Sequence, residues 1–219
     1  MKIRTTLVCY LLLLLSPAFS QSKADAADYT NVIAQRAYKI VTPLGITDSA
    51  KFYRVQHIVM DQYRALSVVH DSSNAHIKAL KSASTSKEEI AAGTKQIDDQ
   101  RLARLQTLHQ SYLNALATEL NPGQIIQVKD GMTYSVLPIT VKAYGEMIPN
   151  LTAEQKTQIL TYLTEAREYA MDAESSEKKH AWFGKYKGKI NNYLSAAGYD
   201  MKKEGEEWQK RIAAKKNTN

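Results

Sequence analysis

Residues 150–200 read NLTAEQKTQILTYLTEAREYAMDAESSEKKHAWFGKYKGKINNYLSAAGYD, and this stretch sets the pattern for the whole chain. Thr152 is a good N-cap because its hydroxyl accepts a hydrogen bond from a free backbone N–H, and Gln155 completes a capping box. Leu160 and Leu163 follow at helical spacing within one apolar stripe. The stretch therefore predicts a helix that begins at a defined residue and packs through one face.

The rest of the chain repeats this kind of pattern. Asn121, Pro122 and Gln124 make a second helix start of the same type. Apolar residues at helical spacing predict a first helix ending near Val41 and a long helix over residues 87–119. Strand alternation is almost absent. We therefore expect an all-α fold, an antiparallel helical bundle of about six or seven helices.

Two local expectations follow from glycine and turn residues. The short helix after Pro122 should end at Gly131, because glycine is common just past helix ends. Residues 132–137 are then expected to be extended. Gly184 and Gly188 lie one helical turn apart, and they predict a place where a second helix packs closely.

The N-terminus has the three parts of a secretory signal peptide: a basic start, an apolar run that reaches Leu15, and small residues before the cleavage site. We expect cleavage after about Ser20, which gives a signal peptide at residues 1–20. Residues 21–219 then form a single all-helical domain with a basic C-terminal tail. The apolar run is shorter than the roughly twenty residues that span a bilayer. We therefore expect no membrane span and a periplasmic or secreted protein.

The cysteine content and the net charge limit how the fold can be stabilised and which kinds of partner the protein can attract. Cys9 is the one cysteine of the chain, and it leaves with the signal peptide, so no disulfide is expected to support the fold. The formal net charge is +7, and residues 177–219 hold 11 Lys and Arg against 5 Asp and Glu. A basic surface attracts acidic glycans, membrane phosphate or nucleic acid. The sign of the charge does not choose among them.

The candidate binding site is the run WFGKYKGKINNY at residues 182–193. One interpretation is a packed aromatic stripe, because Trp182, Tyr186 and Ile190 share a helical face. In the other, the lysines and asparagines point outward, where they suit a sugar carrying carboxylates or sulfates. The predicted ligand-binding residues are Trp182, Lys185, Tyr186, Lys187, Asn191 and Asn192.

Catalytic and metal-binding signals are weak. Glu165, Glu168 and Asp172 share a helical face and are candidate paired carboxylates, although a solvated face is the simpler interpretation. The five histidines include no pair at i, i+3 or i+4, and no HExxH, GxxxxGK[ST] or GxSxG motif occurs. We expect no catalytic residue, metal or cofactor and no nucleic-acid partner.

Four segments carry a resemblance to a known family: LNPGQIIQVKDGMTY, LPITVKAY, NLTAEQKTQI and FGKYKGKINNYLSAAGYD. Together they resemble the family called domain of unknown function 3826, over about Tyr29 to Asp200. The resemblance implies a secreted helical protein, associated with polysaccharide utilisation and described as a candidate sugar binder. The family has no established active site, so no catalytic residue is carried over.

Three functional hypotheses remain. The first is an exported, non-catalytic binding protein for acidic glycan fragments, with an acidic oligosaccharide as its partner. The alternative is a periplasmic chaperone-like or adaptor protein, because residues 151–155 are similar to the LTxxQ motif of small stress chaperones. The third is a glycan-active enzyme, which would need Glu165 or Glu168 in a concave site opposite another carboxylate. The sequence leaves the oligomeric state open.

Overall fold

The structure is a computed structural model that describes residues 18–83 and 86–216. These residues form eight α-helices and one 3₁₀ turn without a β-strand, which confirms the all-α class, although six or seven helices is too low a count. The elements are α1 (Ala18–Val41), η1 (Thr42–Leu44), α2 (Ser49–Ala83), α3 (Lys87–Ala117), α4 (Pro122–Met132), α5 (Val136–Met147), α6 (Ala153–Met171), α7 (Ser176–Ala196) and α8 (Met201–Lys216).

The predicted signal peptide falls largely outside this description, because residues 1–17 are not among the described residues. None of the described helices combines the length and the apolar character that a membrane crossing requires.

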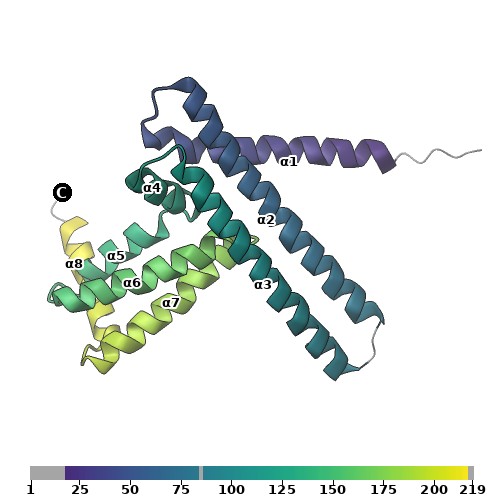
Figure 1. Cartoon of the computed structure of the whole chain (residues 1–219). Helices are drawn as coiled ribbons and strands as arrows, with labels where there is room; N and C mark the ends of the chain where they lie inside the picture. Colours follow the sequence, from purple (N-terminus) through teal and green to yellow (C-terminus); the bar gives the residue numbers. More distant parts are fainter. Residues whose placement is uncertain (1–17, 84–85, 217–219) are drawn as a thin grey trace, which may run out of the picture.

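The first hydrophobic core forms where α1 packs on α2 and α4, beside the antiparallel pair of α2 and α3 (Figure 1). Ile33, Ala37 and Val41 of α1 are fully buried there, at the spacing that places every fourth residue on one face. They pack with Val59 of α2 and Leu116 of α3. The apolar stripes of these helices therefore define this core.

The second core forms among α5, α6 and α7. Leu163 of α6 and Phe183, Ile190 and Leu194 of α7 are completely or almost completely buried in it. Helix α8 packs on α5 and α7 at the far end of this group. The C-terminal tail predicted from the sequence is therefore an additional helix.

Both predicted capping boxes are present. The Thr152 hydroxyl accepts from the Gln155 backbone N–H at 3.1 Å, and the Gln155 side chain accepts from the Thr152 backbone N–H at 2.9 Å. Asn121 and Gln124 make the same reciprocal pair at the start of α4. Each box satisfies two backbone donors that a helix start leaves unpaired.

The connection from α4 to α5 differs from the expectation. Gly131 lies inside α4, and a side chain there would bring its Cβ within 3.2 Å of Ile40. Residues 132–137 are not extended. Tyr134 (φ 58°) and Ser135 (φ 54°) instead form a left-handed turn from which α5 begins. The glycine thus permits close packing on α1, and the reversal falls on two residues that carry side chains.

The glycines of α7 also differ from the expectation, because a Cβ at Gly184 or Gly188 would meet no neighbouring atom within 4 Å. Among residues 18–83 and 86–216, no second helix packs closely on these glycines.

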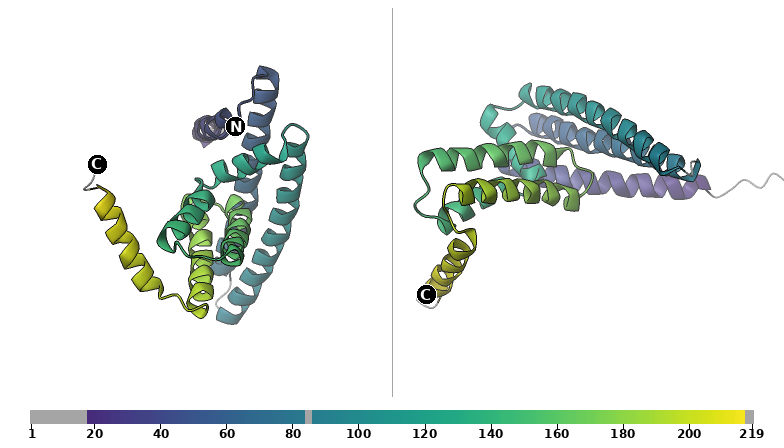
Figure 2. Two further views of the ribbon diagram at one scale, coloured as in Figure 1. Left: turned by 90° about the vertical axis from the view of Figure 1, so that its left-hand side faces the viewer. Right: turned by 90° about the horizontal axis from the view of Figure 1, so that it is seen from below.

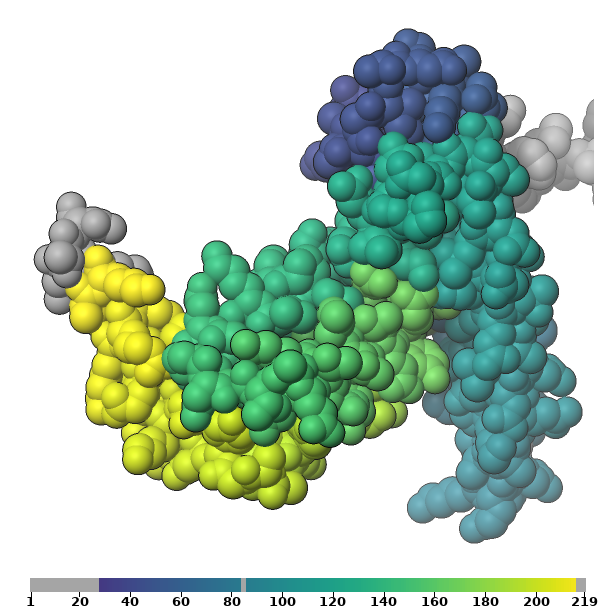
Figure 3. All heavy atoms as spheres, turned by 60° about the vertical axis from the view of Figure 1, so that its left-hand side comes forward, coloured from purple at the N-terminus to yellow at the C-terminus, as the bar shows by residue number. Residues whose placement is uncertain are grey.

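The two cores lie side by side, and the distal part of the α2–α3 pair extends beyond them (Figure 2). In the space-filling view, a notch separates this extension from the C-terminal helices, and α8 stands at the opposite end (Figure 3). The junction between the hairpin and the α6–α7 pair contains the cavities and charged groups described next.

Candidate functional site

The turn between α6 and α7 docks on the middle of α2. The His70 ring is hydrogen-bonded through Nε2 to the backbone oxygen of Asp172 at 2.7 Å. Asn74 donates to the Glu174 carboxylate at 3.2 Å. These contacts join residues that are 100 or more positions apart in the sequence, and they fix the C-terminal helices on the hairpin.

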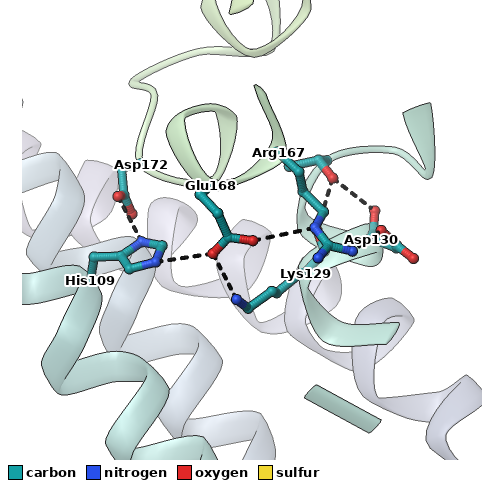
Figure 4. A network of polar contacts seen from close by, with 7 residues as sticks. His109, Lys129, Asp130, Arg167, Glu168 and Asp172 are labelled. Atoms are coloured by element: carbon teal, nitrogen blue, oxygen red, sulfur yellow. Dashed lines mark hydrogen bonds and ion pairs between the residues drawn. The ribbon is translucent and has the colours of Figure 1, made fainter. Parts of the chain in front are cut away.

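A network of charged side chains lies behind this turn (Figure 4). His109 of α3 contacts the Asp172 carboxylate through Nδ1 at 2.8 Å and the Glu168 carboxylate through Nε2 at 3.2 Å. Lys129 of α4 donates to Glu168 at 2.6 Å. Arg167 extends the network, with its Nε 3.5 Å from Glu168 and its Nη1 donating to an Asp130 oxygen at 2.8 Å. The network therefore ties α3, α4 and α6 together.

The network shifts the pKa values of His109 and Glu168. The hydrogen bonds to Asp172 and Glu168 raise the pKa of His109 to about 9. Burial alone would raise the pKa of Glu168, but the hydrogen bonds from His109 and Lys129 outweigh it and lower the pKa to about 2. At neutral pH His109 is therefore an imidazolium and Glu168 a carboxylate, so neither group is poised for proton transfer.

The three candidate carboxylates differ in their exposure to solvent. Glu165 is exposed, whereas the side chains of Glu168 and Asp172 are 30% and 15% exposed. The interpretation as one solvated face is therefore wrong for Glu168 and Asp172. Their partner His109 lies on α3, so the spacing of residues within α6 cannot predict this contact.

Two cavities flank the docked turn. The first, here called the aromatic cavity, has a volume of about 430 Å³ and lies between α3 and the α6–α7 pair. The rings of Tyr169 and Trp182 stack there with centroids 4.5 Å apart and planes 15° apart. Leu102 and Leu105 of α3 line it too. Glu168 and Asp172 lie in its wall, so the network borders a concave site.

The second, here called the basic cavity, has a volume of about 570 Å³ and lies between α1, α2 and the start of α7. Its cations are Arg36 and Lys39 of α1 and Lys179 of α7, and its carboxylates are Asp71 and Glu174. Three tyrosines also line this cavity, namely Tyr29, Tyr63 and Tyr134. Charge, aromatic rings and hydroxyl groups are therefore gathered in one place.

Lys179 is the unusual cation of the basic cavity, because it is only 6% exposed. Its Nζ donates to the Met132 backbone oxygen at 2.9 Å and lies 5.6 Å from the centre of the Tyr63 ring. No carboxylate among the described residues lies within ion-pair distance of it. Burial lowers its pKa to about 8, although Asp172 opposes this effect.

Tyr134 contributes a strained position to the same cavity. A non-glycine residue with positive φ costs of the order of 1 kcal/mol and persists where its surroundings fix it. Here the Tyr134 ring stacks on the His180 ring, with centroids 5.4 Å apart. This stacking holds the tyrosine at the rim.

The six predicted ligand-binding residues do not share one cavity. Trp182 lines the aromatic cavity, and the Lys185 ammonium lies 5.0 Å from the centre of its ring. Tyr186 is buried in the second core. Lys187 and Asn191 line a separate groove beside α8, where the Tyr144 hydroxyl donates to Asn191 at 2.6 Å. Asn192 is exposed.

Lys179 is not among the residues predicted from the sequence, because it precedes the run at residues 182–193. A signal was present, since Lys179, Phe183, Tyr186 and Ile190 follow one another at helical spacing on a single stripe. All four side chains are buried. A lysine in line with an apolar stripe therefore indicated a buried cation.

A family model described as protein of unknown function (DUF3826) matches residues 30–214. The match supports the family resemblance and carries no statement of ligand or activity. No curated protein matches the chain.

Proposed function

The chain belongs to the DUF3826 family, and we propose from its own residues that it is an exported, non-catalytic binding protein for acidic glycan fragments. The observation that carries this proposal is the basic cavity, in which the buried Lys179 and the exposed Arg36 and Lys39 have no carboxylate partner among the described residues.

The physical argument rests on the cost of a buried charge. An ammonium group removed from water loses several kcal/mol of solvation unless an opposite charge compensates. The Met132 carbonyl supplies one hydrogen bond to Lys179, but a carbonyl carries no net charge. A ligand carboxylate in the basic cavity would supply the missing counter-charge, and Arg36 would add a planar donor that matches it.

The other wall residues favour a sugar over a simple anion. Tyr29, Tyr63 and Tyr134 offer ring faces and hydroxyl groups, and tyrosine combines stacking with hydrogen bonding. Asp71 and Glu174 offer acceptors for sugar hydroxyls. The volume of about 570 Å³ falls within the range of sites for organic ligands.

The test is calorimetric titration with a panel of oligouronides, repeated with the same oligosaccharides after their carboxyl groups are reduced to alcohols. We expect binding of the acidic forms, with weaker affinity at higher salt, and loss of binding after reduction. Arg36→Ala and Lys179→Met should each lower the affinity by about tenfold or more, since tenfold corresponds to about 1.4 kcal/mol.

The matched control is Arg104→Ala, which removes the same charge from an exposed position of α3 that lines neither cavity. Circular dichroism checks that each variant is folded. Equal binding of acidic and carboxyl-reduced ligands, or equal losses for Arg36→Ala and Arg104→Ala, would refute the proposal.

The other two hypotheses gain less from the geometry. Both capping boxes serve as helix caps, which accounts for the LTxxQ-like residues without a chaperone role. Glu168 lies in a concave wall, which meets one requirement of the enzyme hypothesis, but Asp172 lies beside it in the same wall instead of opposite to it. The shifted pKa values of Glu168 and His109 also favour a structural role for this network.

A further inference from the structure

The two cavities adjoin, because three residues line both of them. His70, Ala173 and Glu174 line both of them. Of these residues His70 is buried, whereas Ala173 contributes a methyl group. Glu174 contributes a carboxylate that is 32% exposed and accepts a hydrogen bond from Asn74 at 3.2 Å. A ligand that spans both cavities would therefore cross Ala173 and would contact the Glu174 carboxylate or take it from Asn74.

The cavities differ in the charge that they leave uncompensated. In the aromatic cavity, Arg101 is paired with Asp98 at 2.7 Å, and His109 is paired with Asp172 and Glu168. Exposed Lys178 lies at its edge. In the basic cavity, Arg36, Lys39 and Lys179 have no carboxylate partner within the described part of the chain. An acidic group is therefore favoured in the basic cavity and an uncharged one in the aromatic cavity.

The aromatic cavity also offers apolar surface that is open to a ligand. Leu102 is 49% exposed and Tyr169 is 41% exposed, although both are large apolar side chains. Trp182 is half-buried, with Tyr169 stacked on its ring and the Lys185 ammonium 5.0 Å from the ring centre. It therefore adds the edge of its ring to an apolar wall against which a sugar ring packs. Each cavity falls within the range for one small organic ligand, so a monosaccharide fills only one of them.

We infer that the two cavities are adjoining subsites of one groove, which takes an oligosaccharide of mixed charge. An acidic sugar lies in the basic cavity, and an uncharged sugar of the same chain lies against Leu102 and Trp182 in the aromatic cavity. This inference rests on the proposed function and adds to it the length and the charge pattern of the ligand.

The experiment compares free glucuronic acid with a tetrasaccharide in which one glucuronic acid residue is joined to three uncharged sugars. Affinities are measured by calorimetry, and by NMR titration where binding is weak. We expect the tetrasaccharide to bind at least about tenfold more tightly than the free acid. Leu102→Ser and Trp182→Ala should remove most of that gain and leave the affinity for free glucuronic acid unchanged.

Leu160→Ser is the matched control, because Leu160 of α6 is 47% exposed and lines neither cavity. Leu102→Ser is the main variant, since Trp182 also packs against the second core and its removal affects folding. Equal affinities for the two ligands, or equal behaviour of Leu102→Ser and Leu160→Ser, would overturn the inference while the proposed function stands. Failure of both ligands to bind would instead overturn the proposed function and this inference with it.

Discussion

Replacing His109 by glutamine should remove a pH-dependent part of the folding stability. Glutamine keeps a polar side chain of similar length, but it cannot carry the positive charge that lies between Glu168 and Asp172. The variant leaves Asp172 without its ion-pair partner among the described residues and leaves Glu168 with Lys129 and Arg167. The structure therefore predicts a loss that depends on the charge of His109.

The magnitude follows from the pKa. The pKa of His109 rises from 6.5 to about 9, and each unit corresponds to about 1.4 kcal/mol, which gives about 3 kcal/mol. The His109 side chain is 18% exposed, and its two carboxylate partners share other contacts, so about 2 to 3 kcal/mol is the expected loss. Removing one partner of a buried ion pair costs a similar amount.

The pH dependence has a defined sign. Between pH 6.5 and about 9 the native state keeps a proton on His109 that the unfolded chain releases, so the free energy of unfolding falls as pH rises. The contribution is complete below pH 6.5 and is lost above about 9. Lys179, with its pKa lowered to about 8, acts in the opposite direction, but its effect cancels in the difference between wild type and variant.

The measurement is urea unfolding of wild type and His109→Gln at pH values from below 6.5 to above 9. The difference in unfolding free energy should be largest at the acidic end and shrink toward the alkaline end. His57→Gln, which changes an exposed histidine of α2, serves as the control and should show no such trend. A difference that stays constant across this range, or one below about 0.5 kcal/mol throughout, would refute the reasoning.

Three further predictions test other parts of the molecule. Gly188→Ala should raise the free energy of unfolding by about 0.5 to 1 kcal/mol in urea unfolding, because the position is helical and open; a loss of stability would mean that a neighbour packs there. Thr152→Ala should lower the same quantity by about 1 kcal/mol, and Thr152→Ser should restore it, because the hydroxyl caps α6; equal stability of both variants would argue against the cap. The affinity for an oligouronide, measured by calorimetry, should fall as pH rises through about 8, because Lys179 loses its proton there. Lys179→Met should abolish this pH dependence. If the variant keeps the same pH dependence, another group is responsible for it.

The sequence predicted the features that depend on neighbours within a few residues. The N-caps at Asn121 and Thr152 were correct because a cap is completed by a side chain three residues later. The end of α1 at Val41 was correct because helical periodicity stops there and Pro43 follows. The same rules gave the all-α class, since strand alternation is almost absent from the sequence.

Features that depend on which helix faces pack against each other could not be predicted from neighbouring residues in the sequence. The residue type predicts that Gly131 ends a helix, whereas Gly131 lies inside α4 and the close approach of Ile40, far away in the sequence, explains the glycine. Residues 132–137 were read as extended, whereas the packing of α4 and α5 places a left-handed turn at Tyr134 and Ser135.

The candidate site shows the same division. The sequence by itself determined that residues 182–193 form an amphipathic helix with an aromatic stripe, because the stripe follows the 3.6-residue period. Only the tertiary structure decided that Lys179 is buried and shares a cavity with Arg36, and that His109 lies between Glu168 and Asp172. Local preferences fix a helix and its apolar face, but they do not specify which helix covers that face. The charges that meet, and the cavities left between them, arise from that long-range packing.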